Sequence, residues 1–184
     1  MSPTADVSVR LAWGDDVAAV AEVQMRSWRE RYAGVLPADV LDSLPPEEFE
    51  AGWQQAISRP KEARQRVLVA LERATVRGFT ATAPSTDADA DPGHDAEVTE
   101  LVVDPAYRRV GHGSRLLHAA VDTMRSDRFS RAVWWVNVDG DDLRAFLGSQ
   151  GWAPDGGHRE LDLHGDGSVV VKQVRLHTDL TREG

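Results

Sequence analysis

The sequence contains no cysteine. A disulfide scaffold, a zinc site built on thiolates and a covalent mechanism through a thiol are therefore excluded. The absence also agrees with a reducing compartment, where disulfides are rare.

Long apolar runs are missing as well. No segment approaches the roughly 18 apolar residues that a membrane span needs. Residues 1–10 are polar and mixed, without the apolar core of a secretory signal. We therefore expect a cytoplasmic protein with no membrane partner.

Positive charge is scarce. The chain has 21 Lys and Arg against 30 Asp and Glu, a formal net charge of −9. A nucleic-acid-binding protein normally presents a basic face, so we expect no nucleic-acid partner. An acidic surface suits a cationic small molecule or a basic peptide, and it also keeps a protein soluble.

Metal ligands are not arranged in a convincing pattern. Asp87-x-Asp89-x-Asp91 resembles the start of a calcium-binding loop, but its sixth position is Pro92 instead of Gly and its twelfth is Val98 instead of Glu. The six histidines have no ligand spacing. We expect no metal.

The order of hydrophobic patterns predicts one mixed α/β domain. With 184 residues the chain can bury one sizeable core. Periodicity and turn signals indicate alternating strands and helices, with 84–95, rich in Asp, Ala, Pro and Gly, as a mobile loop. Strands are expected at 7–12, 67–71, 76–82, 97–103, 132–138, 160–163 and 169–176, and helices at 17–31, 38–44, 45–59, 111–125 and 141–149.

The segment 97–117 carries the clearest chemistry. A strand ends at Asp104-Pro105, and a glycine turn through Gly111 and Gly113 then opens an amphipathic helix. Unpaired amides of such a turn, with the helix dipole, form an anion site suited to phosphate. The pattern is not a dinucleotide-binding fingerprint, because Leu116 occupies the third glycine position, and no G-K-[ST] follows.

Several motifs in this order resemble the GNAT N-acetyltransferase superfamily. The R-x-x-G-x-G pattern at 108–113 resembles its acetyl-CoA-binding motif, and Arg77-Gly78-Phe79 stands where the preceding hairpin strand is expected. Phe146 with Gly151-Trp152 resembles the later F-x-x-x-x-G-F motif, and residues 26–37 resemble R-S-W-x-x-x-Y-A-G-x-L-P of bacterial members. The resemblance implies a single GNAT-like domain with a mixed, mostly antiparallel sheet of six to seven strands and helices on both faces.

The resemblance also assigns the coenzyme contacts. It implies that the glycine turn holds the coenzyme A pyrophosphate and that the signature strand pairs its free backbone groups with the pantetheine arm. The turn residues are Arg108, Arg109, Val110, Gly111, His112, Gly113 and Ser114, and the strand residues are Leu101, Val102 and Val103. Acetyl-CoA is thus expected as cosubstrate, attacked directly by an amine in a ternary complex.

An amine must lose a proton before it attacks the thioester. Counted back from the glycine motif, Glu97 occupies the position of the catalytic glutamate in the histone-acetylating branch, and Glu100 is the reserve candidate. Trp28 and Tyr32 are four residues apart on one helix face, where they would line the pocket of a small-molecule or peptide amine or belong to the core.

Two departures from the motif weaken the prediction of catalysis. Gly140 replaces an asparagine, and Leu147 replaces a tyrosine that can protonate the leaving thiolate. A coenzyme A-binding sensor or partner module without useful catalysis therefore remains the alternative, and a longer acyl donor is a third possibility. Family members often pair through their late strands, so the resemblance also makes a homodimer plausible.

Overall fold

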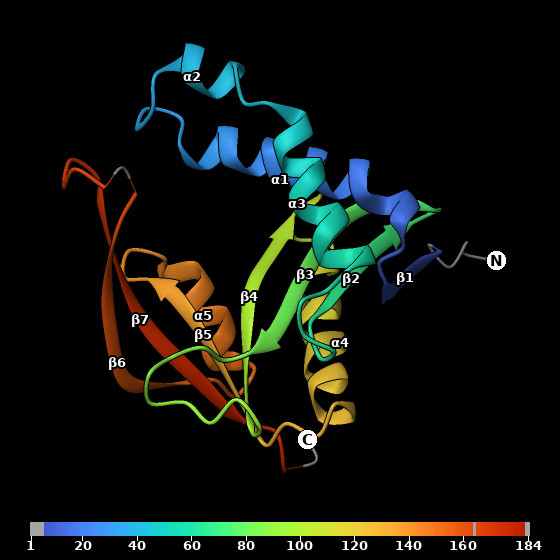
Figure 1. The fold of residues 1–184 in the computed structure, drawn as a ribbon, viewed down its shortest axis with the longest axis vertical. Helices are drawn as coiled ribbons and strands as arrows, with labels where there is room; N and C mark the ends of the chain where they lie inside the picture. Colours follow the sequence, from blue (N-terminus) through green and yellow to red (C-terminus); the bar gives the residue numbers. More distant parts are fainter. Residues whose placement is uncertain (1–5, 164, 183–184) are drawn as a thin grey trace. The chain divides into compact units, whose positions relative to one another are not determined.

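The computed structural model describes residues 6–163 and 165–182, and within them the chain forms a mixed, mostly antiparallel sheet of seven strands with order β1-β2-β3-β4-β5-β7-β6. The predicted fold class is confirmed (Figure 1). By their contacts the residues form two compact units, Met1–Ala83 with Glu100–Thr123 and Pro84–Thr99 with Met124–Gly184. We call them the first and second units.

The first unit contains three antiparallel strands and most of the helices. Strand β1 (Val7–Leu11) pairs with β2 (Arg66–Glu72), and β2 pairs with β3 (Thr75–Pro84). The β2–β3 turn places Arg73 and Ala74 at φ of 50° and 68°, as a tight two-residue hairpin requires. The helices are α1 (Val17–Arg31), α2 (Ala38–Asp42), α3 (Pro46–Ser58) and the start of α4 (His112–Ser126), with short 3-10 turns at Gly14–Asp16 and Pro105–Tyr107.

Helices cover both faces of this part of the sheet. Helices α1 and α3 pack on one face, where Val20, Trp53 and Phe79 belong to one buried cluster. Gly78 faces the other way, since a Cβ built on it would lie 3.1 Å from Leu116 Cδ1 of α4. The period of apolar residues in these helices therefore matches the faces that they bury.

In the second unit, β5 (Arg131–Asn137) lies between the start of β4 (Asp95–Val103) and β7 (Val170–Asp179). The β4–β5 pairing is parallel, and β7 is antiparallel to both β5 and β6 (Ala153–Asp162). The predicted strand at 160–163 was too short. The first half of the strand contains Pro154, Gly156 and Gly157, which are typical of loops and therefore hid the strand pattern. This half also contains a register shift, which such residues accommodate.

The sheet of the second unit has one apolar face. Trp134 is 6% exposed and its ring centroid lies 6.1 Å from that of Trp152, while Leu147 of α5 (Asp141–Ser149) is fully buried. Trp135, the next residue of β5, is half-buried on the opposite face with polar partners. Of these two neighbouring tryptophans, only Trp134 belongs to the core.

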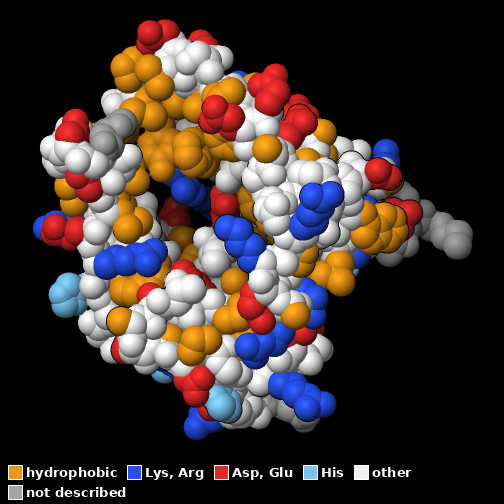
Figure 2. Space-filling view, viewed as in Figure 1, with side chains coloured by type: hydrophobic (Ala, Val, Ile, Leu, Met, Phe, Trp, Pro, Cys, Tyr) orange, Lys and Arg blue, Asp and Glu red, His pale blue; other side chains and the backbone are white. Residues whose placement is uncertain are grey.

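Acidic side chains cover part of the first unit. Figure 2 shows them over α2 and the first turn of α3, where Asp39, Asp42, Glu47 and Glu48 are exposed. Among the described residues no helix is long and apolar enough to cross a membrane, and none of them form a cluster of three or more His, Asp or Glu that could hold a metal ion.

Candidate active site

The turn before α4 has the backbone of an anion site. Gly111 has φ of 92°, which favours glycine, and α4 begins at the next residue. The amide of Arg115 donates to the carbonyl of Gly111, so the amides of His112, Gly113 and Ser114 precede the first intrahelical hydrogen bond. A Cβ on Gly113 would meet only Val103 Cγ2, at 3.7 Å. The turn can therefore present several N–H donors to a phosphate.

Three arginines lie at this turn, and the coenzyme contacts of the two predicted ones, Arg108 and Arg109, stay a prediction. Arg108 forms a 2.6 Å ion pair with Glu30 of α1, and Arg109 has φ of 63°. Arg115, which the sequence analysis did not select, places its guanidinium 3.3 Å from where a Cβ on Gly111 would stand. Its spacing from Gly111, one helical turn, was the signal that could have identified it.

The ring of His112 is buried beneath the turn, with 2% exposure. Its two nitrogens form no hydrogen bond with any residue that the structure describes, and Nε2 lies 3.8 Å from the Glu72 carboxylate. Burial and the charge of Arg115 lower the pKa of His112, against the opposing effect of Glu72. The residue thus contributes a neutral buried ring and a backbone amide.

The signature strand is fixed on one side by β3. The Thr80 hydroxyl donates to the Glu100 carbonyl at 2.9 Å. Gly78 allows the two strands to approach, because a Cβ there would lie only 2.7 Å from the Val102 carbonyl oxygen. On its other side, the parallel ladder of β4 with β5 covers Asp95–Glu97. The predicted strand residues 101–103 follow this point.

Glu100 lies in the first unit with an oriented carboxylate. Gln24 Nε2 donates to its two oxygens at 3.0 and 3.2 Å, and Gln24 Oε1 accepts from Trp53 Nε1 at 2.7 Å. Burial raises the pKa of Glu100, although Gln24 and the charge of Arg31 oppose this. These hydrogen bonds from Trp53 through Gln24 to Glu100 depend on tertiary packing, which cannot be inferred from the sequence.

Glu97 lies in the second unit, half-buried, and its carboxylate forms no hydrogen bond with the described residues. Burial raises its pKa, and the charge of Asp87 raises it further, whereas Arg159 and Arg175 act in the opposite direction. A carboxylate with a raised pKa is a better proton acceptor than an ordinary one. Its surroundings therefore suit a general base.

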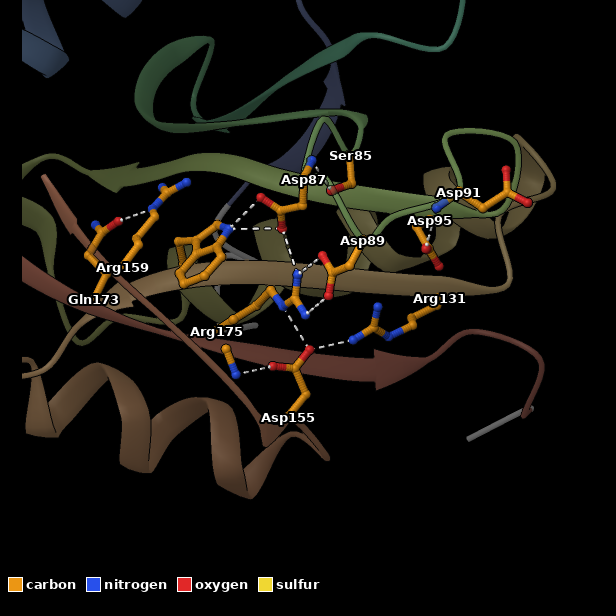
Figure 3. Close-up of polar contacts among 12 residues, drawn as sticks. Ser85, Asp87, Asp89, Asp91, Asp95, Arg131, Asp155, Arg159, Gln173 and Arg175 are labelled. Carbon is orange, nitrogen blue, oxygen red and sulfur yellow. Dashed lines mark hydrogen bonds and ion pairs between the residues drawn. The ribbon is translucent and has the colours of Figure 1, made fainter.

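The charges near Glu97 belong to a network centred on Arg175 (Figure 3). Arg175, 7% exposed, contacts Asp87 at 3.0 Å, Asp155 at 2.8 Å and Asp89 at 2.6 and 2.7 Å. Trp135 Nε1 donates to both oxygens of Asp87 at 3.1 and 3.2 Å. The hydrogen bonds from Arg175 lower the pKa of Asp89 to about 2.

These contacts attach the loop between β3 and β4 to β7. The sequence predicts mobility for 84–95, and the structure has a loop there that ends where β4 begins. Asp87 and Asp89 of this loop both bind the Arg175 guanidinium. Such ion pairs favour an anchored loop, so the mobility of the loop stays a prediction that these contacts oppose.

Trp28 and Tyr32 lie together, as their spacing predicts. Their ring centroids are 5.5 Å apart, and Trp28 also meets Phe49 of α3 at 5.4 Å. Both are half-buried, in the first unit. The contact with Phe49 gives Trp28 a packing role, and contact with a substrate stays a prediction.

Comparison with known proteins places the chain among acetyltransferases. The profile of the acetyltransferase (GNAT) family matches residues 19–152. The chain is 30% identical over 131 residues, 71% of each chain, to an uncharacterized N-acetyltransferase, YuaI, of Bacillus subtilis.

Solved structures share the fold. A PaiA N-acetyltransferase of Thermoplasma acidophilum in complex with coenzyme A has a TM-score of 0.71 and 20% identity, over 95% of this chain and 99% of that one. The YncA protein of Salmonella typhimurium, with acetyl-CoA, has a TM-score of 0.71 and 16% identity, over 97% and 96%.

Proposed function

The chain belongs to the acetyltransferase (GNAT) family and is an acetyl-CoA-dependent N-acetyltransferase, and we propose the residue roles that follow. The observation that carries the proposal is the strand–turn–helix of β4 and α4. Within the described residues, the amides of Gly113 and Ser114 precede the first hydrogen bond of α4, and the strand residues 101–103 lead directly into this turn. Family membership and this geometry support the same activity.

The turn residues 108–114 hold the coenzyme A pyrophosphate, and Leu101, Val102 and Val103 pair with the pantetheine arm. Amides at the start of a helix bind phosphate well, and the guanidinium of Arg115 beside Gly111 adds positive charge. When bound, acetyl-CoA supplies the thioester carbonyl that the amine attacks. Amides of β4 stabilise the oxyanion that forms.

Glu97 accepts the proton of the amine, directly or through water. Its raised pKa and the absence of a hydrogen-bond partner in the described chain support this role. Glu100 is the second candidate, since Gln24 orients its carboxylate and burial raises its pKa. The attacking amine forms the C–N bond, the C–S bond breaks, and coenzyme A leaves as its thiolate.

The pH dependence of the two glutamine variants tests this assignment. Glu97→Gln should lower kcat by about 100-fold or more and remove the acid limb of kcat/KM, whereas Glu100→Gln and the exposed control Glu160→Gln should retain that limb. A base must be ionised, so the wild-type limb should lie above pH 4.5, the ordinary pKa of a glutamate. Loss of the limb in Glu100→Gln alone would transfer the role to Glu100.

A coenzyme A-binding module without useful turnover is the second candidate function. It is favoured by Leu147, which is fully buried where many relatives have a proton-donating tyrosine. Release of coenzyme A that depends on an added amine would refute it, because a sensor has no need to cleave the thioester.

We also propose that the protein acts in the cytoplasm of a bacterium and forms a homodimer through its late strands. Exposed apolar side chains at Val138, Leu163 and Val170 of the second unit support the dimer, because burying them would remove apolar surface from water. Sedimentation velocity of wild type and Leu163→Glu tests it, with dimer in the first and monomer in the second as the expected result.

A further inference from the structure

One face of the sheet in the second unit is polar and charged. The β5–β7 register pairs Trp135 with Arg175 and Asn137 with Gln173, and the β6–β7 register pairs Arg159 with Gln173. Partners in a ladder point to the same face of a sheet, so these side chains lie together. Glu97 pairs with Val133 in the β4–β5 ladder, and Val133 and Trp135 are two residues apart on β5, so Glu97 lies on this same face.

The three arginines of this face differ in their partners. Arg131 and Arg175 are bound by carboxylates, through Asp155 for the first and through three aspartates for the second. Arg159 instead donates its Nε to a neutral amide, Gln173 Oε1, at 2.8 Å. Among the residues that the structure describes, no carboxylate lies within ion-pair distance of Arg159.

Two contacts hold Arg159 in a fixed orientation. Its guanidinium stacks on the Trp135 ring, 4.3 Å from the ring centroid, and Trp135 is held in turn by Asp87. Gln173 Nε2 donates to Asn137 Oδ1 at 3.0 Å, which fixes the orientation of the Gln173 amide and turns its oxygen to Arg159. Gln173 occupies Nε of Arg159, and Trp135 covers one face of its guanidinium. The two Nη groups then remain as a pair of donors whose geometry matches a carboxylate.

We propose that Arg159 binds a carboxylate of the acceptor, so that the substrates are amines that also carry an acid group, such as amino acids. This inference rests on the proposed N-acetyltransferase activity with Glu97 at the reacting amine. In an amino acid the amine and the carboxylate are a few bonds apart, and the strand registers place Glu97 and Arg159 on the same face of the sheet. Trp135 and Gln173 are positioning residues for this arginine.

The arrangement also disfavours purely cationic acceptors. A polyamine would place a second positive charge near Arg159, and Arg175 already satisfies the aspartates that could attract it. The negative net charge of the chain thus does not determine the sign of the group that this face recognises. The local pairing of charges determines it.

The test compares matched acceptors. The twenty common amino acids are screened with acetyl-CoA, and the best is compared with its primary amide and with the amine that lacks the carboxyl group. Wild type should prefer the acid over the amide in kcat/KM by about 10- to 100-fold, the range expected for one charge-assisted contact. Spermidine is screened in parallel as the cationic alternative.

The variant Arg159→Gln should raise KM for the acid by a similar factor and leave KM for the amide unchanged. Arg182→Gln, an exposed arginine of the same unit, is the control and should keep the preference. Arg159→Lys, which retains the charge, should retain part of it, and acetyl-CoA affinity reports whether each variant is folded. A structural role alone would change both KM values together.

Equal or better use of the amide, the plain amine or spermidine by wild type would overturn the inference and leave the acetyltransferase activity in place. So would an acid preference that persists in Arg159→Gln. If no amine of any class is acetylated, or if acetyl-CoA does not bind, the proposed function itself fails, and the two failures are thereby distinguished.

Discussion

Replacing Arg175 with methionine should destabilise the second unit strongly. The Arg175 side chain is 9% exposed, and its guanidinium is shared by Asp87 and Asp155, whose side chains are 15% and 9% exposed. Methionine keeps most of the apolar stem, so the change isolates the charge. Removing one partner from a buried ion pair costs about 3–5 kcal/mol, because the remaining charges stay in a poorly solvated place.

The lower end of that range is expected for Arg175→Met. Asp87 keeps its bond from Trp135, and Asp155 keeps Arg131 and the Gly157 amide at 2.9 Å. A loss of about 3 kcal/mol corresponds to a fall in Tm of roughly 6–12 °C for a chain of this size. Urea denaturation followed by circular dichroism gives the free energy of unfolding directly.

Two controls separate burial from charge. Arg182→Met removes an arginine that is 87% exposed, and it should change the free energy of unfolding by less than about 0.5 kcal/mol. Asp89→Asn removes a carboxylate that is 64% exposed, and it should have a much smaller effect than Arg175→Met despite its short contacts. If Arg175→Met costs less than about 1 kcal/mol, the aspartates are well solvated without it and the reasoning from burial is wrong.

Two further predictions concern the first unit. Gly78→Ala should lower the free energy of unfolding by about 1–3 kcal/mol, because the new Cβ would lie 2.7 Å from the Val102 carbonyl oxygen. Gly52→Ala in α3, with open space around it, should raise that free energy by about 0.5–1 kcal/mol. Urea denaturation of both variants measures these changes. The lowered pKa of His112 means that the unfolded chain takes up a proton near pH 6.5 and the folded chain does not, so stability is full above that pH and falls below it. The free energy of unfolding, measured about one pH unit above and one below 6.5, should therefore fall less in His112→Leu than in the wild type. The same pH dependence in both proteins would contradict this prediction.

The sequence was most informative where periodicity and turn chemistry act locally. The helix at 17–31 has the predicted bounds, and the helix at 141–149 does as well, because apolar spacing and terminal glycines specify them. The first half of β6 escaped prediction, since Pro154 and the following glycines are usual loop residues and only pairing with β7 makes them a strand.

In the candidate site, too, local patterns could be predicted and contacts between distant elements could not. The glycine turn could be predicted because its residues are consecutive in the chain. Gln24, Arg159 and Arg175 could not, because each acquires its role from a partner in another element: Gln24 meets Glu100 across 76 positions, and Arg175 meets Asp87 across 88. A single sequence contains no signal for such pairs, since any exposed arginine or glutamine has the same local appearance.

Calorimetric titration with acetyl-CoA tests the central claim most directly, with coenzyme A and NADH as comparison ligands. Binding of acetyl-CoA with Kd of about 1–100 μM and none of NADH is predicted. Gly113→Arg should abolish that binding by filling the phosphate turn, while Gly52→Arg on the open surface of α3 should leave it unchanged. A folded protein that binds no coenzyme A species, or a Gly113→Arg variant that binds acetyl-CoA as the wild type does, would contradict the assignment of this turn.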